Sequence, residues 1–192
     1  HSKKEYLEKV ENVKPNITQK RIIEFCETKG INRIFSIGSG IASLEYCLKK
    51  LSKIPVIVSD YDSSICRLKE FKIFDDVLQI DALNDILPID ENTLVIFARI
   101  DTEFEDESLK LIFQKCKIAG VKYIWFIPAE LINIRILLAE FKIFLICKLL
   151  NKKRVFCGYA RTKKAFINLW SEFYKIETEF KKINRSFFLK YR

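Results

Sequence analysis

The 192-residue sequence lacks methionine and contains only five glycines, four prolines and one histidine, at position 1. With a single histidine, we do not expect a zinc site of the usual histidine and cysteine type. None of the six cysteines forms a Cys-x-x-Cys pair, and free cysteine is among the most frequently buried residue types. We therefore expect buried free thiols in a reducing, cytoplasmic compartment.

Long uncharged segments are absent as well. No run of 18 residues is free of charge, because the most apolar segment, 131–150, contains Arg135, Glu140, Lys142 and Lys148. We therefore predict no transmembrane helix. With 49% hydrophobic and 31% charged residues, the chain has the composition and length of one folded domain with its own core.

Short apolar segments alternate with helical patterns through the first two thirds of the chain. Strands are predicted at 33–37, 55–59, 77–80, 93–97 and 121–127, with helices at 42–53, 63–72 and 108–119. Two more helices precede them, at 3–13 and from a Thr18 cap to Gly30. Apolar strands separated by helices predict an α/β fold with a doubly wound, mostly parallel sheet covered on both faces.

The pattern changes after Pro128. A long apolar helix is predicted over 130–150, an extended segment over 154–159, and a helix from a Thr162 cap to about Tyr174. Two final strands, 175–180 and 186–191, flank a turn-like Lys-Ile-Asn-Arg. They complete a seven-stranded sheet with a C-terminal antiparallel hairpin.

A glycine turn follows the first predicted strand, at Gly38-Ser39-Gly40. Glycines at the end of a strand allow a ligand to approach the backbone closely, and the helix that follows offers unpaired N–H groups. Strand-to-helix turns often contain glycine for other reasons, so this motif alone is a weak signal.

Carboxylates stand at the ends of the next two strands. Asp60 ends the second strand 22 residues after Gly38, where an acid can accept hydrogen bonds from both hydroxyls of a ribose; nearby Asp62 fits a helix cap. Asp81 ends the third strand, where it could accept from an adenine amine while the Ala82 N–H donates to the ring. A turn role accounts for Asp81 equally well.

These three strand ends, on a sheet that closes with a hairpin, resemble the class I (Rossmann-like) S-adenosylmethionine-dependent methyltransferases over residues 20–192. The resemblance implies S-adenosyl-L-methionine as cofactor, with its methionine part at the glycine turn, its ribose at the second strand and its adenine at the third. The residues matched to cofactor-binding positions are Ser36, Gly38, Ser39, Gly40, Asp60, Tyr61, Asp81 and Ala82. Two departures stand out: Ser36 replaces the family's usual acid, and Ala42 replaces its third glycine.

The segment Gly158-Tyr159-Ala160-Arg161-Thr162 and the helix after it look like the small-molecule and glycan branch of this family. That resemblance divides the single domain 1–192 into N-terminal helices (1–30), a cofactor-binding half (31–128), an acceptor-binding insertion (129–161) and a final helix and hairpin (162–192). The implied function is methyl transfer to a small molecule or glycan precursor. The alternatives are an RNA methyltransferase, an NAD-dependent oxidoreductase sharing Gly38, Gly40 and Asp60, and a non-catalytic binding subunit.

A catalytic base is needed only if the acceptor must lose a proton, since alignment of the reactants supplies much of the rate. In the absence of a suitable histidine, the candidates are Asp101, Glu103, Glu130 and Tyr159. Asp101 is the first choice because it follows the fourth strand, where the methyl group is expected.

Positive charge is concentrated late in the chain. From Lys142 onward there are 14 Lys and Arg against three acids, whereas the preceding residues carry 20 basic and 22 acidic groups. This charge either keeps the surface solvated or attracts an anionic partner: a phosphorylated acceptor, RNA or an anionic membrane surface. We expect a small phosphorylated acceptor, because no basic stripe interleaved with base-stacking aromatics is evident.

Overall fold

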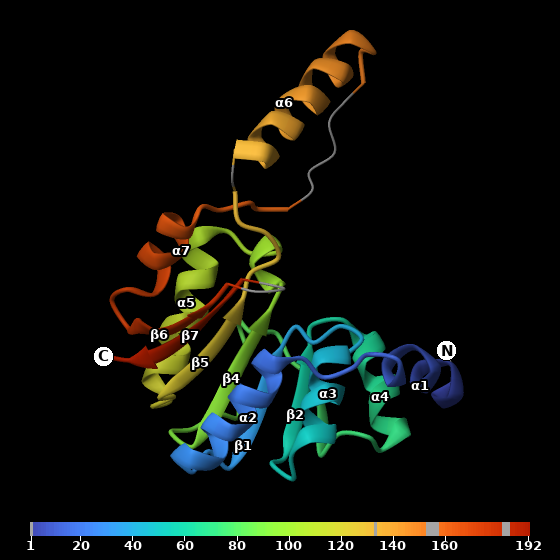
Figure 1. Ribbon diagram of the computed structural model, residues 1–192, viewed down its shortest axis with the longest axis vertical. Helices are drawn as coiled ribbons and strands as arrows, with labels where there is room; N and C mark the ends of the chain where they lie inside the picture. Colours follow the sequence, from blue (N-terminus) through green and yellow to red (C-terminus); the bar gives the residue numbers. More distant parts are fainter. Residues whose placement is uncertain (1, 133, 153–157, 182–184) are drawn as a thin grey trace.

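The computed structural model describes residues 2–132, 134–152, 158–181 and 185–192. Its seven-stranded sheet has the order β3-β2-β1-β4-β5-β7-β6 (Figure 1). The strands are β1 (Arg33–Ile37), β2 (Val56–Asp60), β3 (Asp76–Gln79), β4 (Thr93–Ala98), β5 (Tyr123–Ile127), β6 (Tyr174–Phe180) and β7 (Ser186–Tyr191). The first five are parallel to one another, and β7 is antiparallel to both β5 and β6. The predicted sheet with its C-terminal hairpin is confirmed.

Helices cover both faces of the sheet. One face packs against α1 (Lys3–Glu11), α2 (Ile17–Lys29), α3 (Ser43–Leu51) and α4 (Cys66–Phe71), the last preceded by the 3₁₀-helix η1 (Ser63–Ile65). The other face packs against α5 (Asp106–Ile118) and α7 (Lys163–Trp170). The 3₁₀-helix η2 (Ile100–Thr102) follows β4, and α6 (Ile134–Leu149) projects away from both layers (Figure 1).

Burial on both faces accounts for the continuous apolar strands. Along β4, Leu94 and Ile96 join the core beneath the first helix layer, whereas Val95 and Phe97 join the core beneath α5 and α7. All four are fully buried. Because successive side chains of a strand point to opposite faces, a strand covered twice needs apolar residues at every position.

Several predicted boundaries shift. Asn16, two residues before Thr18, caps α2 through a bond from the Gln19 N–H. Gly30 ends this helix in the left-handed region as predicted. Thr162 caps α7, but this helix ends at Trp170 and Tyr174 begins β6. Of the predicted extended segment 154–159, residues 154–157 lie outside the described part of the chain.

The described cysteines are free thiols, as expected, but they are not all buried. Cys26, Cys47 and Cys116 are buried, Cys66 is exposed on α4 and Cys147 is half-buried on α6. Within the described residues, no helix combines the length and hydropathy needed to cross a membrane.

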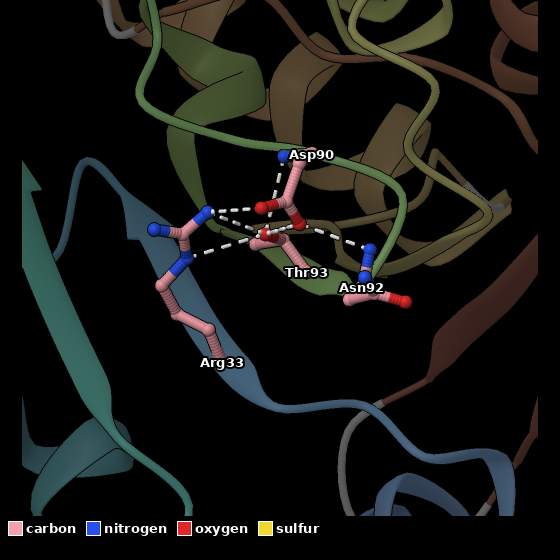
Figure 2. A network of polar contacts seen from close by, with 4 residues as sticks. All are labelled: Arg33, Asp90, Asn92 and Thr93. Carbon is pink, nitrogen blue, oxygen red and sulfur yellow. Dashed lines mark hydrogen bonds and ion pairs between the residues drawn. The ribbon is translucent and has the colours of Figure 1, made fainter.

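A polar network fastens the amino ends of β1 and β4 (Figure 2). Arg33 donates to the Asp90 carboxylate at 2.8 Å and to the Thr93 hydroxyl at 3.1 Å. The Thr93 hydroxyl in turn donates to Asp90 at 2.8 Å, and the Asn92 N–H donates to the same carboxylate at 2.9 Å. The candidate site lies at the opposite ends of these strands, the carboxyl ends.

Phe113 of α5 is the centre of an aromatic cluster between this helix and the sheet. Its ring lies 5.1 Å from Phe97, 5.9 Å from Phe126 and 5.7 Å from Trp170, measured between ring centroids. We expect Phe113→Ala to lower the free energy of unfolding by about 3–5 kcal/mol, because it leaves a cavity in a packed core. Chemical denaturation measures the change. The control is Leu111→Ala on the same helix, where the side chain is partly exposed and the cost should stay below about 1 kcal/mol.

Candidate functional site

A cavity of about 720 Å³ opens at the carboxyl ends of β1, β2, β3 and β4. Its wall is built from the residues that follow each of these strands: 37–40, 60–62, 80–83 and 98–100, joined by Glu103 and Phe104. In the strand order, β1 lies between β2 and β4, and ligands of doubly wound folds bind where the order reverses in this way. A shallower hollow of about 780 Å³ at the amino side, lined by Glu27, Asn32 and residues 49–55, contains none of the predicted site residues.

The glycine turn after β1 packs against Ile100, which follows β4. Gly38 has φ +68°, and a Cβ at this position would overlap Ile100 Cγ2. Gly40 has φ +53° and faces open space, since a Cβ there would meet nothing within 4 Å. Ala42, at the position of the missing third glycine, also takes a left-handed conformation with φ 52° and is fully buried. The backbone at Ala42 thus takes a conformation typical of glycine, which costs a residue with a side chain about 1–2 kcal/mol.

Asp60 lies where β2 ends, half-buried in the cavity wall. One carboxylate oxygen accepts from the Gly40 N–H at 2.9 Å and the other from the Asp62 N–H at 3.0 Å. Because a carboxylate offers about four acceptor positions, both oxygens retain capacity for ligand hydroxyls. Tyr61 is exposed at the cavity rim, with 73% of its surface accessible.

Asp81 and Ala82 lie beside each other in the same wall. The Asp81 carboxylate closes a turn by accepting from the Leu83 N–H at 2.9 Å and the Asn84 side-chain amide at 2.7 Å. The Asn84 side-chain bond, then that of Leu83, lowers the Asp81 pKa. No described acceptor pairs with the Ala82 N–H. The turn role and the predicted adenine role are therefore compatible at this position.

Ser36 does not line the cavity, and its hydroxyl points to a second carboxyl group. The fully buried hydroxyl donates to Glu45 Oε1 of α3 at 2.5 Å. Burial raises the pKa of Glu45 to about 7, although the Ser36 bond opposes the rise. The Ser36 carbonyl accepts from the Ser59 and Ser39 hydroxyls, at 2.8 and 3.3 Å. Glu45 therefore contacts the glycine turn through Ser36, on the buried side of the turn.

Charges around the cavity are mainly negative. Four carboxylates line it, from Asp60, Asp62, Asp81 and Glu103, against the single guanidinium of Arg99. This balance favours a ligand that carries positive charge.

Arg99 connects this cavity to a second hollow of about 370 Å³ at the ends of β4 and β5. The backbone of Arg99 is left-handed, with φ 63°, a conformation that costs a non-glycine residue about 1–3 kcal/mol and is concentrated at functional sites. Glu130 and Arg185 also line the second hollow, and Arg185 pairs with Glu179 at 3.1 Å. No described carboxylate forms an ion pair with Arg99.

Asp101 lies in η2 and lines neither hollow. Its side chain is fully buried, and Oδ1 accepts from the Ala129 N–H at 2.8 Å. No described group donates to Oδ2. Burial raises the Asp101 pKa, against the opposing bond from Ala129. The geometry supports Asp101 in positioning the segment after β5, and its role as a base stays a prediction.

Arg161 belongs to the basic late part of the chain, but its side chain is buried. It is 4% exposed, and its guanidinium donates to the Asp106 carboxylate at 2.6 Å and to the carbonyls of Asp101 and Phe104. Its own carbonyl accepts from the Ile132 N–H at 2.9 Å. A residue from a basic stretch of the sequence is thus an internal anchor, because acceptors on the η2–α5 connection surround it.

Sequence reasoning missed Glu45 and Arg99. The signal for Glu45 was a carboxyl group on the apolar side of α3, next to Leu44, Cys47 and Leu48. The signal for Arg99 was a positive charge directly after a buried strand. Both signals are common in sequences, so only the spatial arrangement distinguishes them.

Several solved structures share this fold. Magnesium protoporphyrin IX methyltransferase from Synechocystis PCC 6803, solved with S-adenosylmethionine bound, superposes with a TM-score of 0.60 at 10% identity, over 91% of this chain and 78% of that one. Human N-acetylserotonin methyltransferase gives 0.64 at 16% identity, over 99% and 56%. Mitomycin 7-O-methyltransferase gives 0.66 at 13% identity, over 92% and 54%. The chain thus spans little more than half of the last two.

No family model matches the sequence, and no curated protein matches it significantly. The likeness is therefore one of structure, at identities of 10–16% in these three cases. The chain has the fold of the class I S-adenosylmethionine-dependent methyltransferases.

The buried Glu45 carboxyl predicts an unusual pH dependence of stability. Its pKa is raised from 4.5 to about 7 in the folded state, so folding takes up a proton there, and stability falls as the pH rises from about 4.5 through about 7. We expect Glu45→Gln to remove this loss, on the order of 3 kcal/mol between pH 5 and pH 8. Urea denaturation of both proteins at the two pH values measures it.

The matched control is Glu91→Gln, since Glu91 is exposed and pairs with Lys122 at the surface. This substitution should leave the difference in unfolding free energy between pH 5 and pH 8 as it is in the wild type. If the free energy of unfolding changed equally between pH 5 and pH 8 in the wild type and in Glu45→Gln, a buried, proton-binding Glu45 would be contradicted.

Proposed function

We propose that this chain binds S-adenosyl-L-methionine in the cavity at the ends of β1–β4 and methylates a small molecule or glycan precursor. The acidic lining of a cavity built on a glycine turn carries the proposal. When bound, the cofactor supplies a methyl group on a positively charged sulfonium. The first two structural neighbours reported above were solved with this cofactor, which supports the same choice here.

The residues present fit this cofactor. Gly38 and Gly40 line the cavity and can face the methionine part, Asp60 has acceptor capacity for the ribose hydroxyls, and the Ala82 N–H can donate to the adenine ring. Leu83, Ile100 and Phe104 provide apolar wall for the base. The volume of about 720 Å³ is within the usual range of about 300–1,000 Å³ for small-molecule sites.

A nicotinamide dinucleotide fits less well. Its pyrophosphate would lie at the N-terminus of the helix after the first strand, which here is α3. Glu45 occupies the first turn of α3 and is buried there. Four carboxylates around the cavity would also repel an anionic ligand. These charges support a methyltransferase over an oxidoreductase.

We place the acceptor in the hollow at the ends of β4 and β5, where Arg99 borders the cofactor cavity. The guanidinium can hold an acceptor phosphate or carboxylate by paired hydrogen bonds. Segment 129–161 contributes Ala129, Glu130 and Leu131 to this hollow, in keeping with its predicted acceptor-binding role. Glu130 and Glu103 face the two hollows and are the proposed bases for an acceptor that must lose a proton.

We favour a small acceptor over RNA because several late basic residues are already paired. Arg161 binds Asp106, and Lys163 and Arg185 both bind Glu179. Their charge is partly neutralised within the protein. We place the activity in the cytoplasm, where the free thiols would stay reduced.

Asp60 provides the first test of the cofactor site. S-adenosylhomocysteine should raise the melting temperature of the protein, and NAD should not. Asp60→Ala should weaken S-adenosylhomocysteine about ten- to a hundredfold, because a charged acceptor to buried hydroxyls contributes about 1.5–3 kcal/mol. Isothermal titration calorimetry measures the affinity.

Glu70→Ala serves as the control, since this carboxylate is exposed on α4 and lies outside the lining of the cavity. Its affinity should change less than about threefold, an energy below about 0.7 kcal/mol. Unchanged binding in a folded Asp60→Ala protein would remove Asp60 from the site, and stabilisation by NAD alone would favour the oxidoreductase.

Arg99 provides the test of the acceptor. With methyl-labelled S-adenosylmethionine and pairs of acceptors that differ only by a phosphate or carboxylate, the anionic member should be methylated more efficiently. Arg99→Gln should lower kcat/KM for that member about tenfold or more and leave the neutral member nearly unchanged. Arg21→Gln, on the exposed side of α2, is the control. Equal losses for both members would assign Arg99 a structural role, and absence of transfer to every acceptor despite cofactor binding would favour the non-catalytic subunit.

A further inference from the structure

Helix α6 extends outward from the rest of the protein as a separate projection (Figure 1). No described helix or strand packs closely along it. Leu149 is 84% exposed, Leu138 63% and Phe141 59%. Exposed apolar surface of this extent on a folded domain indicates a site that binds another protein or a membrane.

The exposed apolar side chains surround the helix. At 3.6 residues per turn, Ile143 and Leu145 lie on nearly opposite sides, and both are more than 40% exposed. Apolar residues exposed along α6 and just after it are Leu137, Leu138, Phe141, Ile143, Phe144, Leu145, Ile146, Leu149 and Leu150. One partner helix or groove would cover a single side, whereas a helix that is apolar all round needs an environment that encloses it.

The length of α6 limits what that environment can be. Its 16 residues rise about 24 Å at 1.5 Å each, which is shorter than the hydrocarbon core of about 30 Å. No described helix is able to span a membrane. The helix can therefore enter one leaflet without crossing the bilayer.

Positive charge accompanies this apolar surface. Lys142 and Lys148 lie on α6, and exposed Lys152 follows it. Lysine side chains of this kind extend along apolar surface and place their ammonium groups among lipid headgroups. The net charge of +9 adds a long-range attraction to a negative surface.

The base of the projection is fastened to the candidate site. Leu131 before α6 and Arg161 after it pair as a parallel bridge, and Arg161 is held by Asp106 and by the Phe104 carbonyl. The returning chain also passes tightly over η2, since a Cβ on Gly158 would come within 2.8 Å of Thr102 Cβ. The two ends of the segment that carries α6 are therefore held against residues that line the hollows.

From these observations we propose that α6 inserts into one leaflet of an anionic membrane and docks the protein on its surface. The exposed apolar side chains enter the acyl region, and the lysines contact anionic headgroups. The two hollows are then held close to the membrane, where an acceptor carried by a lipid is accessible.

Vesicle flotation with the full chain tests the proposal. The protein should float with vesicles of phosphatidylcholine and phosphatidylglycerol, and much less with phosphatidylcholine alone. Leu145→Glu and Ile143→Glu, tested separately, should each reduce binding at least tenfold, because a carboxylate within hydrocarbon opposes insertion from either side. Lys142→Gln and Lys148→Gln should each weaken binding to the anionic vesicles about fivefold.

Ile118→Glu on α5 is the matched control, since Ile118 is 78% exposed on a helix that packs on the sheet. It should float like the wild type, and all variants should keep their affinity for S-adenosylhomocysteine. Absence of flotation with both vesicle types overturns the proposal. Sedimentation velocity showing a dimer that only one of the two glutamate variants disrupts overturns it in favour of a second copy of the chain. Failure of the wild type to bind the cofactor would reject the proposed function and leave the flotation result standing.

Discussion

The contact between Gly38 and Ile100 is the constraint on which the candidate site depends. It brings the turn after β1 against the first residue of η2, because the Ile100 side chain occupies the space that a Cβ on Gly38 would need. The strand order places β2 and β3 on one side of this contact and β5 on the other. The larger cavity and the second hollow therefore lie on either side of one junction, and Arg99 lines both.

Two carboxyl groups near this junction have different environments and hence different chemistry. Asp60 is half-buried in the cavity wall and accepts from two backbone N–H groups. Glu45 is enclosed beneath the turn and accepts from the Ser36 hydroxyl, so burial holds its pKa near 7. Desolvation disfavours the charged form of a carboxyl group, and donors to the carboxylate favour it. The position where the methyltransferase family usually has an acid is thus filled by a serine that contacts an acid from α3.

Arg161 connects the sheet to its projecting helix. A buried guanidinium requires several acceptors, and Asp106 together with the carbonyls of Asp101 and Phe104 supplies them. These groups all belong to the connection from β4 to α5, which also borders the cavity. The same interaction therefore holds the chain that returns after α6 against residues beside the candidate site.

The sequence by itself determined the order of strands and helices, the caps at Gly30 and Thr162, the C-terminal hairpin, and the gathering of the segments around Gly38, Asp60 and Asp81 at one edge. These features follow from local periodicity, from residues with special backbone preferences, and from the rule that parallel strands end at the same edge. The binding roles of the three residues remain predictions.

Only the tertiary structure decided how charges pair across the chain and which apolar surfaces remain uncovered. The Ser36–Glu45 bond joins residues nine positions apart, and Arg161 meets the Asp101 carbonyl across 60 positions. In the sequence, Arg161 was one of many late cations and 130–150 was an apolar helix within the predicted acceptor-binding insertion, because composition specifies what a side chain needs but not which neighbour provides it. Packing determined that Arg161 is enclosed by acceptors, whereas α6 extends beyond the elements that could have buried it.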